Sequence, residues 1–171
     1  MPTGILLVAE RAVTVAAQIA PTPRRILDVG CGFGKYGVLL REYLDPTPQV
    51  DGIEMWEPYV EPHRLKGIYT TLRVGDALHL KRADLDPYDM VMMGDVIEHM
   101  DKDAALAFLS RVSGSVVIAT PVAFFQAGHE GLPPTESHVS HWDRKTFEDT
   151  GRLEHYEESY GAIVARLSQT R

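Results

Sequence analysis

Apolar runs alternate with segments of helical periodicity along most of the chain. The runs lack the apolar–polar alternation of a half-exposed strand, and each ends at or beside a glycine, a proline or an acidic residue. Strands of this kind, alternating with helices, are typical of a parallel sheet that is covered on both faces. The pattern therefore predicts an α/β fold with a doubly wound, mostly parallel sheet. The predicted strands lie at residues 24–30, 49–55, 69–77, 88–95 and 115–121.

Helical patterns occupy several connections between these strands. An amphipathic helix is predicted within residues 1–23, and a short, proline-interrupted one at residues 60–66. The segment 101–112 begins at Asp101, whose carboxylate can cap the free N–H groups of a first helical turn. The clearest apolar stripe lies in the segment 35–44 and consists of Tyr36, Leu39, Leu40, Tyr43 and Leu44.

The C-terminal third has a different pattern. Residues 122–142 contain two prolines, two glycines and three histidines and show no periodicity, which is typical of a lid or binding loop. A short helix is predicted at 143–151, and the runs at 153–159 and 162–168 flank the turn Tyr-Gly. These two runs predict an antiparallel hairpin at one edge, which gives a seven-stranded sheet.

Composition limits the classes of protein to which the chain can belong. A length of 171 residues with 44% hydrophobic and 24% charged residues indicates one globular domain, 1–171. The net charge of −7 argues against nucleic acid as a partner, because phosphate backbones favour basic surfaces. Cys31 is the one cysteine, so no internal disulfide is possible. Glu10 and Arg11 interrupt the N-terminal apolar stretch, which argues against a signal peptide or membrane span and favours a cytoplasmic protein.

A glycine-rich turn follows the first predicted strand, where close approach of a ligand to the backbone needs residues without a Cβ. Two interpretations of this turn are open. Gly32, Gly34 and Gly37 fit the dinucleotide pattern G-x-G-x-x-G, with Glu54 at the distance expected for an acidic ribose ligand. The segment from Asp28 to Gly34 equally fits the pattern D-x-G-x-G-x-G.

Acidic residues at the following strand ends distinguish the two interpretations. Glu54 ends the second strand, Asp76 the third, and Asp95 opens the sequence Asp-Val-Ile-Glu-His after the fourth. Together with the glycine turn, these segments resemble the class I S-adenosylmethionine-dependent methyltransferases, and the last is similar to a D-V-x-E-H segment common in the small-molecule members. A nicotinamide enzyme would account for the first two matches alone.

The resemblance implies a Rossmann-like fold and S-adenosylmethionine as cofactor. It implies that the glycine turn wraps the methionine part, that Glu54 holds the ribose and that Asp76 meets the adenine. One carboxylate can accept from both ribose hydroxyls, in bonds of about 1.5–3 kcal/mol each. Trp56 can pack on the adenine or simply in the core. The expected cofactor-binding residues are Asp28, Gly30, Cys31, Gly32, Gly34, Glu54, Met55, Trp56, Asp76, Ala77 and Asp95.

Methyl transfer is an in-line displacement and needs mainly correct positioning of the acceptor. A base is required only for an acceptor, such as a hydroxyl, that must lose a proton early. His99 is the candidate base, and His138 and His141 are candidates for contacting the acceptor from a lid that Trp142 anchors. Glu98 is expected to be structural or solvent-facing.

The sequence supports a metal site in the histidine-bearing segment 122–142 less well than it supports a lid. His138 and His141, with His129 or Glu130, could supply three ligands, but a lone H-x-x-H pair without cysteines is a weak signal, and no metal is predicted. The short chain favours methylation of a small-molecule acceptor, without a membrane or nucleic-acid partner. The alternatives are methylation of a macromolecule and a non-catalytic module that binds S-adenosylmethionine.

Overall fold

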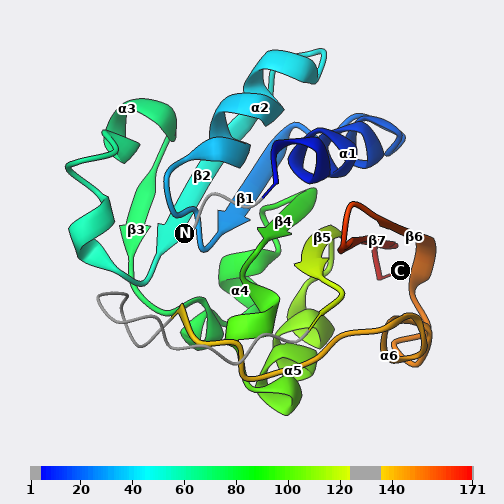
Figure 1. Ribbon diagram of the computed structural model, residues 1–171. Coiled ribbons are helices and arrows are strands. Elements are labelled where there is room, and N and C mark those ends of the chain that lie inside the picture. Colours follow the sequence, from blue (N-terminus) through cyan, green and yellow to red (C-terminus); the bar gives the residue numbers. More distant parts are fainter. Residues whose placement is uncertain (1–4, 124–135, 171) are drawn as a thin grey trace.

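The computed structural model describes residues 5–123 and 136–170 (Figure 1). Seven strands form one sheet in the order β3-β2-β1-β4-β5-β7-β6. The first five strands run parallel, and β7 pairs antiparallel with both β5 and β6. The predicted doubly wound sheet with an antiparallel edge hairpin is therefore confirmed. The strands are β1 (Arg25–Val29), β2 (Gln49–Glu54), β3 (Leu72–Val74), β4 (Met90–Gly94), β5 (Ser115–Pro121), β6 (Leu153–Ser159) and β7 (Ala162–Leu167).

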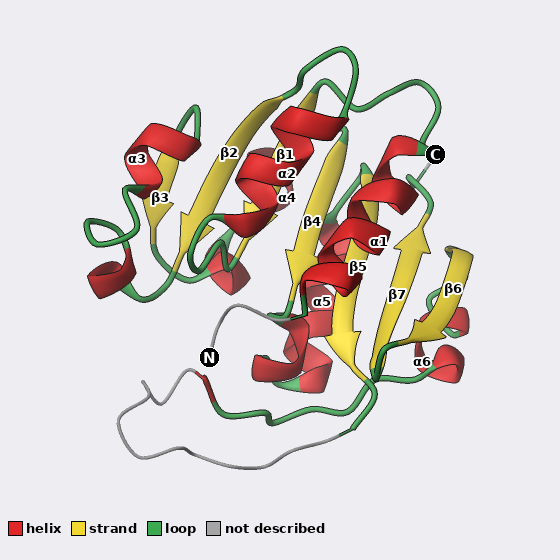
Figure 2. Ribbon diagram, turned by 45° about the horizontal axis from the view of Figure 1, so that its top comes forward, coloured by secondary structure: helices red, strands yellow, loops and turns green. Residues whose placement is uncertain are grey.

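Helices cover both faces of this sheet, with α1 and α2 on one side and α5 and α6 on the other (Figures 1 and 2). Alternate residues of β4 enter the two cores, so Met92 packs toward α1 and α2 while Met93 packs toward α5. Burial on both faces explains why β1, β4 and β5 are apolar almost throughout. The helices are α1 (Leu6–Ala17), α2 (Lys35–Tyr43), α3 (Leu65–Ile68), α4 (Arg82–Leu85), α5 (Lys102–Arg111) and α6 (Arg144–Glu148).

Two helices begin at the residues that the sequence predicts. The Asp101 carboxylate accepts the N–H of Ala104 at 3.0 Å, and the Asp143 carboxylate accepts the N–H of Thr146 at 2.8 Å. Each bond satisfies one of the free donors of a first helical turn. Gly151, the predicted stop after α6, has a φ of +68°.

Some of the other helix predictions are wrong. Residues 60–66 do not form one helix, because Arg64 has a φ of +53° and α3 starts only after it. The short α4 and the 3₁₀ turn Ala77–His79 were not predicted, since four-residue helices carry no full apolar stripe. In α2 the stripe is narrower than expected, and Tyr43 is 64% exposed.

No helix within residues 5–123 and 136–170 combines the length and the apolar character needed to cross a membrane.

Candidate active site

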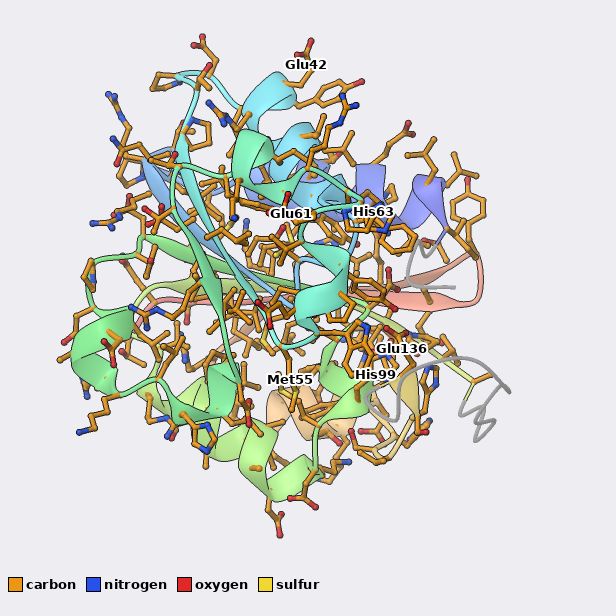
Figure 3. The ribbon with its side chains drawn as sticks, turned by 90° about the vertical axis from the view of Figure 1, so that its left-hand side faces the viewer. Glu42, Met55, Glu61, His63, His99 and Glu136 are labelled. Atoms are coloured by element: carbon orange, nitrogen blue, oxygen red, sulfur yellow. The ribbon has the colours of Figure 1, made fainter. Side chains whose placement is uncertain are left out.

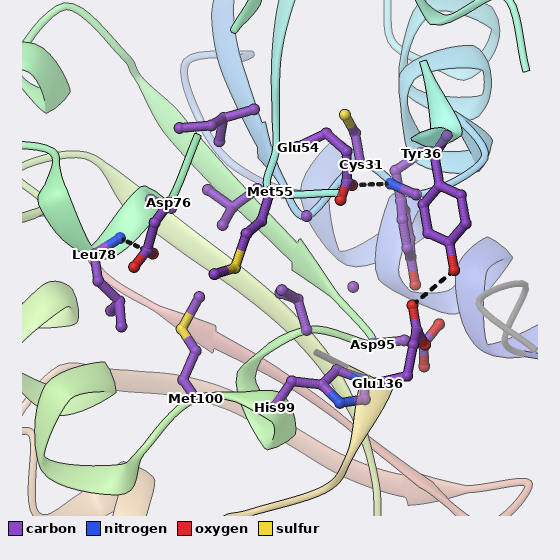
Figure 4. Close-up of a pocket in the computed structure, with 18 of the residues that line it drawn as sticks. Cys31, Tyr36, Glu54, Met55, Asp76, Leu78, Asp95, His99, Met100 and Glu136 are labelled. Carbon is purple, nitrogen blue, oxygen red and sulfur yellow. Dashed lines mark hydrogen bonds between the residues drawn. The ribbon is translucent and has the colours of Figure 1, made fainter. Parts of the chain in front are cut away.

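A pocket of about 240 Å³ opens at the carboxyl edge of the sheet (Figure 4). The register sets Val29 level with Ile53 on one side and Met93 on the other, so β1, β2 and β4 end at the same height. The chain turns in opposite directions after β1 and β4, and such a switch point is where open α/β sheets bind ligands. Its lining includes Gly30 and Gly32 of the glycine turn and the polar residues Glu54, Asp76, Asp95 and His99.

The glycine turn forms one wall of the pocket. Gly30, Gly32 and Gly34 all have positive φ, at +65°, +51° and +83°, a conformation that L side chains rarely adopt. A Cβ on Gly30 would also lie 2.4 Å from a methyl of Val96. Gly30 and Gly32 line the pocket, whereas Gly34 lies at the start of α2, where an added Cβ would lie 2.5 Å from Cδ1 of Ile68. The glycines of this turn are therefore needed for their backbone conformation and, at Gly30, for the lack of space for a Cβ.

Cys31 lines the pocket between these glycines and is buried. Burial, reinforced by the nearby Asp28 and Glu54, raises the pKa of its thiol far above the usual range. A thiol held in this protonated form is a poor nucleophile, which fits a packing role.

The Glu54 carboxylate ties the glycine turn to the end of β2. One oxygen accepts the backbone N–H of Gly32 at 2.8 Å, and the other accepts the backbone N–H of Trp56 at 2.7 Å. The carboxylate is buried, so two N–H donors compensate for much of the hydration that it loses. Each oxygen keeps a further lone pair with which to accept a ligand hydroxyl.

An apolar slot lies beside Asp76. One Asp76 oxygen accepts the backbone N–H of Leu78 at 2.8 Å, which fixes the carboxylate at the rim. Met55 and Met100 point toward one another next to it, and Met55 is 54% exposed (Figure 4). Ala77 also lines this part of the pocket. A flat ring between two thioethers, with an acceptor at its edge, would suit this slot.

Asp95 bridges β4 and α2. Its carboxylate lies 3.1 Å from the ammonium group of Lys35, and its backbone has a φ of +55°, which is uncommon outside glycine. The neighbouring Tyr36 is buried, and its hydroxyl has no hydrogen-bond partner among the described residues. Burial, together with the charge of Asp95, raises the pKa of Tyr36 well above its usual value, so this hydroxyl is a donor.

Three of the expected cofactor-binding residues do not line the pocket: Gly34, described above, Trp56 and Asp28. Trp56 is half-buried outside it and contributes its backbone N–H to Glu54. Asp28 is buried beneath the glycine turn and accepts the hydroxyl of Tyr69 at 2.6 Å. Burial raises the pKa of Asp28 to about 7. Asp28 faces the same core as Ile26, because side chains alternate along β1, and this places it outside the pocket.

The raised pKa of Asp28 predicts a pH-dependent stability. A carboxyl whose folded pKa exceeds its unfolded value stabilises the fold below about pH 4, and this contribution is lost as the pH rises toward about 7. Asp28→Asn keeps an acceptor for Tyr69 but does not ionise. The stability of the variant relative to wild type should therefore rise by up to about 1.4 kcal/mol per pH unit in this window. Urea unfolding of both proteins at pH 5 and pH 7.5 measures the change, and a pH-independent difference would contradict it.

Glu98, His99 and His138 lie together on the other side of the pocket. Glu98 is buried and accepts the hydroxyl of Thr120 at 2.9 Å, which fits the structural role expected of it. Burial and the charge of Asp95 raise the pKa of Glu98 to about 8. The rings of His99 and His138 approach edge to face, with centroids 4.9 Å apart. Burial and the neighbouring His99 lower the pKa of His138.

The structure does not bring His141 to the pocket. Its side chain is exposed, and its backbone oxygen accepts from the ammonium group of Lys102 at 2.9 Å. Trp142, the expected anchor, is buried and stacks on Phe147 at 5.4 Å between centroids. The remaining part of the predicted lid, residues 124–135 with His129 and Glu130, lies outside the described residues.

Sequence reasoning missed an aromatic wall beside the glycine turn. Tyr59 donates its hydroxyl to Glu136 at 3.1 Å, and Phe33 stacks on His63 with ring centroids 3.7 Å apart. Tyr59, Phe33 and Glu136 line the pocket, and Figures 3 and 4 both place Glu136 beside His99. Tyr59 and Glu136 are 77 residues apart in the chain, and neither lies in a motif that could have indicated the contact.

The fold and this pocket define a Rossmann-like ligand-binding protein of the methyltransferase type. A family model described as a methyltransferase domain matches residues 26–116, so the chain belongs to this family and is an S-adenosylmethionine-dependent methyltransferase domain. This membership confirms the resemblance seen in the sequence and decides between the two interpretations of the glycine turn.

Solved structures share the fold at low sequence identity. The N-terminal domain of EvdMO1, solved with S-adenosylhomocysteine bound, is 21% identical with a TM-score of 0.66, over 95% of this chain and 81% of that one. Magnesium protoporphyrin IX methyltransferase (ChlM) from Synechocystis PCC 6803 is 18% identical with a TM-score of 0.66, over 96% and 83%. Mitomycin 7-O-methyltransferase MmcR is 14% identical with a TM-score of 0.65, over 96% and 54%.

Proposed function

We propose that this protein transfers the methyl group of S-adenosylmethionine to a small-molecule acceptor. The observation that carries the proposal is the division of one pocket into two sides. Glu54 and Asp76 present carboxylate oxygens on one side, and His99 lies with Glu136 on the other. We further propose that residues 1–171 form one methyltransferase domain, because strands between Arg25 and Leu167 share a single sheet.

The cofactor-side residues fit the parts of S-adenosylmethionine in order. Glu54 would accept the ribose hydroxyls through the lone pairs that its two backbone bonds leave free. Asp76 would accept the adenine amino group, with the ring between Met55 and Met100. The adjoining residues Gly30, Cys31, Gly32, Ala77 and Asp95 complete this side, and Gly34 shapes the turn without lining the pocket.

The methionine end of the cofactor would lie near Asp95 and Lys35. An ammonium–carboxylate pair at this point matches an amino acid group that carries both charges. The hydroxyl of Tyr36, which has no hydrogen-bond partner in the described part of the chain, is a further donor at the same end. When bound, S-adenosylmethionine supplies a methyl group already activated by the sulfonium, so these residues act by binding and orienting.

The acceptor side supports a small substrate. Segment 136–142 closes this side by contacts on both of its ends, from Glu136 to Tyr59 and from Trp142 to Phe147. We propose that it belongs to the lid predicted at 122–142, with His99 and His138 facing the acceptor. The names of two of the similar structures, a magnesium protoporphyrin IX and a mitomycin 7-O-methyltransferase, also denote small acceptors.

Calorimetric titration with S-adenosylhomocysteine and with NAD tests the cofactor assignment. We expect saturable binding of S-adenosylhomocysteine and none of NAD. Incubation with methyl-labelled S-adenosylmethionine and pools of small hydroxyl, carboxyl and amino compounds then tests the acceptor. Label that appears in added proteins or nucleic acids, and in no small compound, would overturn the small-acceptor assignment. Binding of NAD alone would overturn the proposal as a whole.

A further inference from the structure

We propose that Glu98, His99 and His138 bind a divalent transition-metal ion on the acceptor side of the pocket. One ligand atom from each residue can be chosen so that all three lie within 4.8 Å of one another. Two imidazoles and one carboxylate are a set that binds Zn²⁺ or Fe²⁺ and leaves coordination positions open for water or substrate. His99 lines the pocket, so an open position would face the acceptor side.

His99 is held in the form that a metal ligand needs. Its Nδ1 lies 3.1 Å from the backbone oxygen of Ser137. A carbonyl oxygen can only accept, so Nδ1 carries the hydrogen, and in the neutral ring Nε2 then has a free lone pair. Metal-bound histidines commonly donate their second ring N–H to a backbone carbonyl in this way, which fixes both the tautomer and the ring orientation.

Glu98 is a buried carboxylate without a cationic partner. No ion pair to Glu98 is found in the described parts of the chain, and its one side-chain bond is to the Thr120 hydroxyl. An isolated charge in a protein interior is costly, so an unpaired buried carboxyl keeps its proton. A divalent ion would displace that proton and supply the compensating positive charge, while Thr120 would orient the carboxylate.

His138 supplies the third ligand. Its Nδ1 is buried and has no hydrogen-bond partner among the described residues. The backbone that follows His138 is nevertheless bonded to Glu98. The N–H groups of Val139 and Ser140 both donate to the backbone oxygen of Glu98, at 2.8 and 3.1 Å. An unpaired nitrogen in a segment clamped to the other two ligands is explained by a bound ion.

Binding requires a small contraction of this cluster. Ligand atoms about 2.0–2.2 Å from a tetrahedral ion lie roughly 3.3–3.6 Å apart, so the widest separations would close by about an ångström. The His138 side chain can make this movement by changing its torsion angles while the backbone stays bonded to Glu98.

The ion would activate an oxygen acceptor; this part of the inference rests on the proposed function. Coordination lowers the pKa of a bound hydroxyl, which loses its proton to solvent. The oxygen then forms the new C–O bond, while the methyl–sulfur bond breaks and its electron pair stays on sulfur. The acceptor class is accordingly a hydroxyl compound, and neither histidine has to act as the base.

The experiment is a metal titration of the tag-free, chelator-treated protein, with Zn²⁺ in a calorimeter and with Co²⁺ by its visible d–d absorption. We expect one equivalent to bind, with Co²⁺ bands of a nitrogen–oxygen site. His138→Ala and His99→Ala should each weaken binding by more than about a hundredfold. Thr120→Val should weaken it by about ten- to a hundredfold, as loss of a supporting hydrogen bond does.

Two exposed histidines serve as matched controls. His141→Ala alters the same segment three residues on, and His79→Ala removes a side chain that is 87% exposed, so both should bind Zn²⁺ as wild type does. Circular dichroism checks that each variant is folded. Absence of a tight equivalent, or binding that survives His138→Ala and His99→Ala, would overturn the metal site. S-adenosylhomocysteine binding measured on the same samples tests the proposed function separately, since none of the cofactor-side residues is changed.

Discussion

Glu54→Gln is expected to weaken S-adenosylhomocysteine binding by about ten- to a hundredfold. The wild-type carboxylate accepts one backbone N–H on each oxygen, from Gly32 and from Trp56. A glutamine amide has a single oxygen, so its NH₂ group would face one of these donors and leave that donor unpaired. The charge-assisted bonds that we propose between Glu54 and the ribose would be lost as well. Together these losses amount to about 1.5–3 kcal/mol, which is measured as the change in calorimetric affinity.

The matched control for this prediction is Glu57→Gln. Glu57 is exposed, lies three residues further along the chain and does not line the pocket, so the same change of charge there should leave affinity within about twofold of wild type. Equal affinities of wild type and Glu54→Gln would show that the ribose lies elsewhere. Equal losses in both variants would point to a general effect of net charge.

Gly94→Ala is expected to destabilise the fold and to distort the pocket. A Cβ on Gly94 would lie 1.8 Å from Cε2 of Tyr36, a ring that is buried between β4 and α2. The ring must therefore move, and with it the first turn of α2 that carries Lys35. Overpacking of this kind costs about 1–3 kcal/mol, or roughly 3–10 °C in melting temperature for a chain of this size. Thermal unfolding and S-adenosylhomocysteine titration measure the two effects.

Gly67→Ala is the control, because Gly67 lies in α3 and an added Cβ would have no heavy atom within 4 Å. This change should be neutral or slightly stabilising. The double variant Gly94→Ala/Tyr36→Ala tests the cause directly. If the clash with the ring is responsible, adding Gly94→Ala to a Tyr36→Ala background should cost much less than adding it to wild type. Full additivity of the two changes would contradict the steric explanation.

Much of the fold was predictable because its determinants are local or periodic. Unbroken apolar runs indicated the buried strands, and Asp101 and Asp143 marked helix starts through caps that reach only three residues ahead. The acidic strand ends were also predictable as a group. Parallel strands bring their carboxyl ends to one edge, so Glu54, Asp76 and Asp95 had to meet there.

Other features depended on contacts that no local pattern records. Asp28 faces the core rather than the pocket because of its place in the alternation of side chains along β1. Its hydrogen-bond partner, Tyr69, is 41 residues away in the chain. His138 and His141 are indistinguishable as an H-x-x-H pair. The path of the extended segment turns the first toward His99 and the second toward solvent. The hydrogen-bond partners of Glu98 come from β5 and from segment 136–140.

The double hydrogen bond to the backbone oxygen of Glu98 has a consequence for how this enzyme can diversify. Val139 and Ser140 fix the position of His138 from its C-terminal side, and Trp142 secures the same stretch to the core. His138 is thus positioned through the backbone of its own segment rather than through the side chains that line the pocket. Substitutions of pocket-lining side chains that leave these two bonds intact should therefore keep His138 beside His99. On the proposed function, the range of acceptors can change in this way without displacing the histidines.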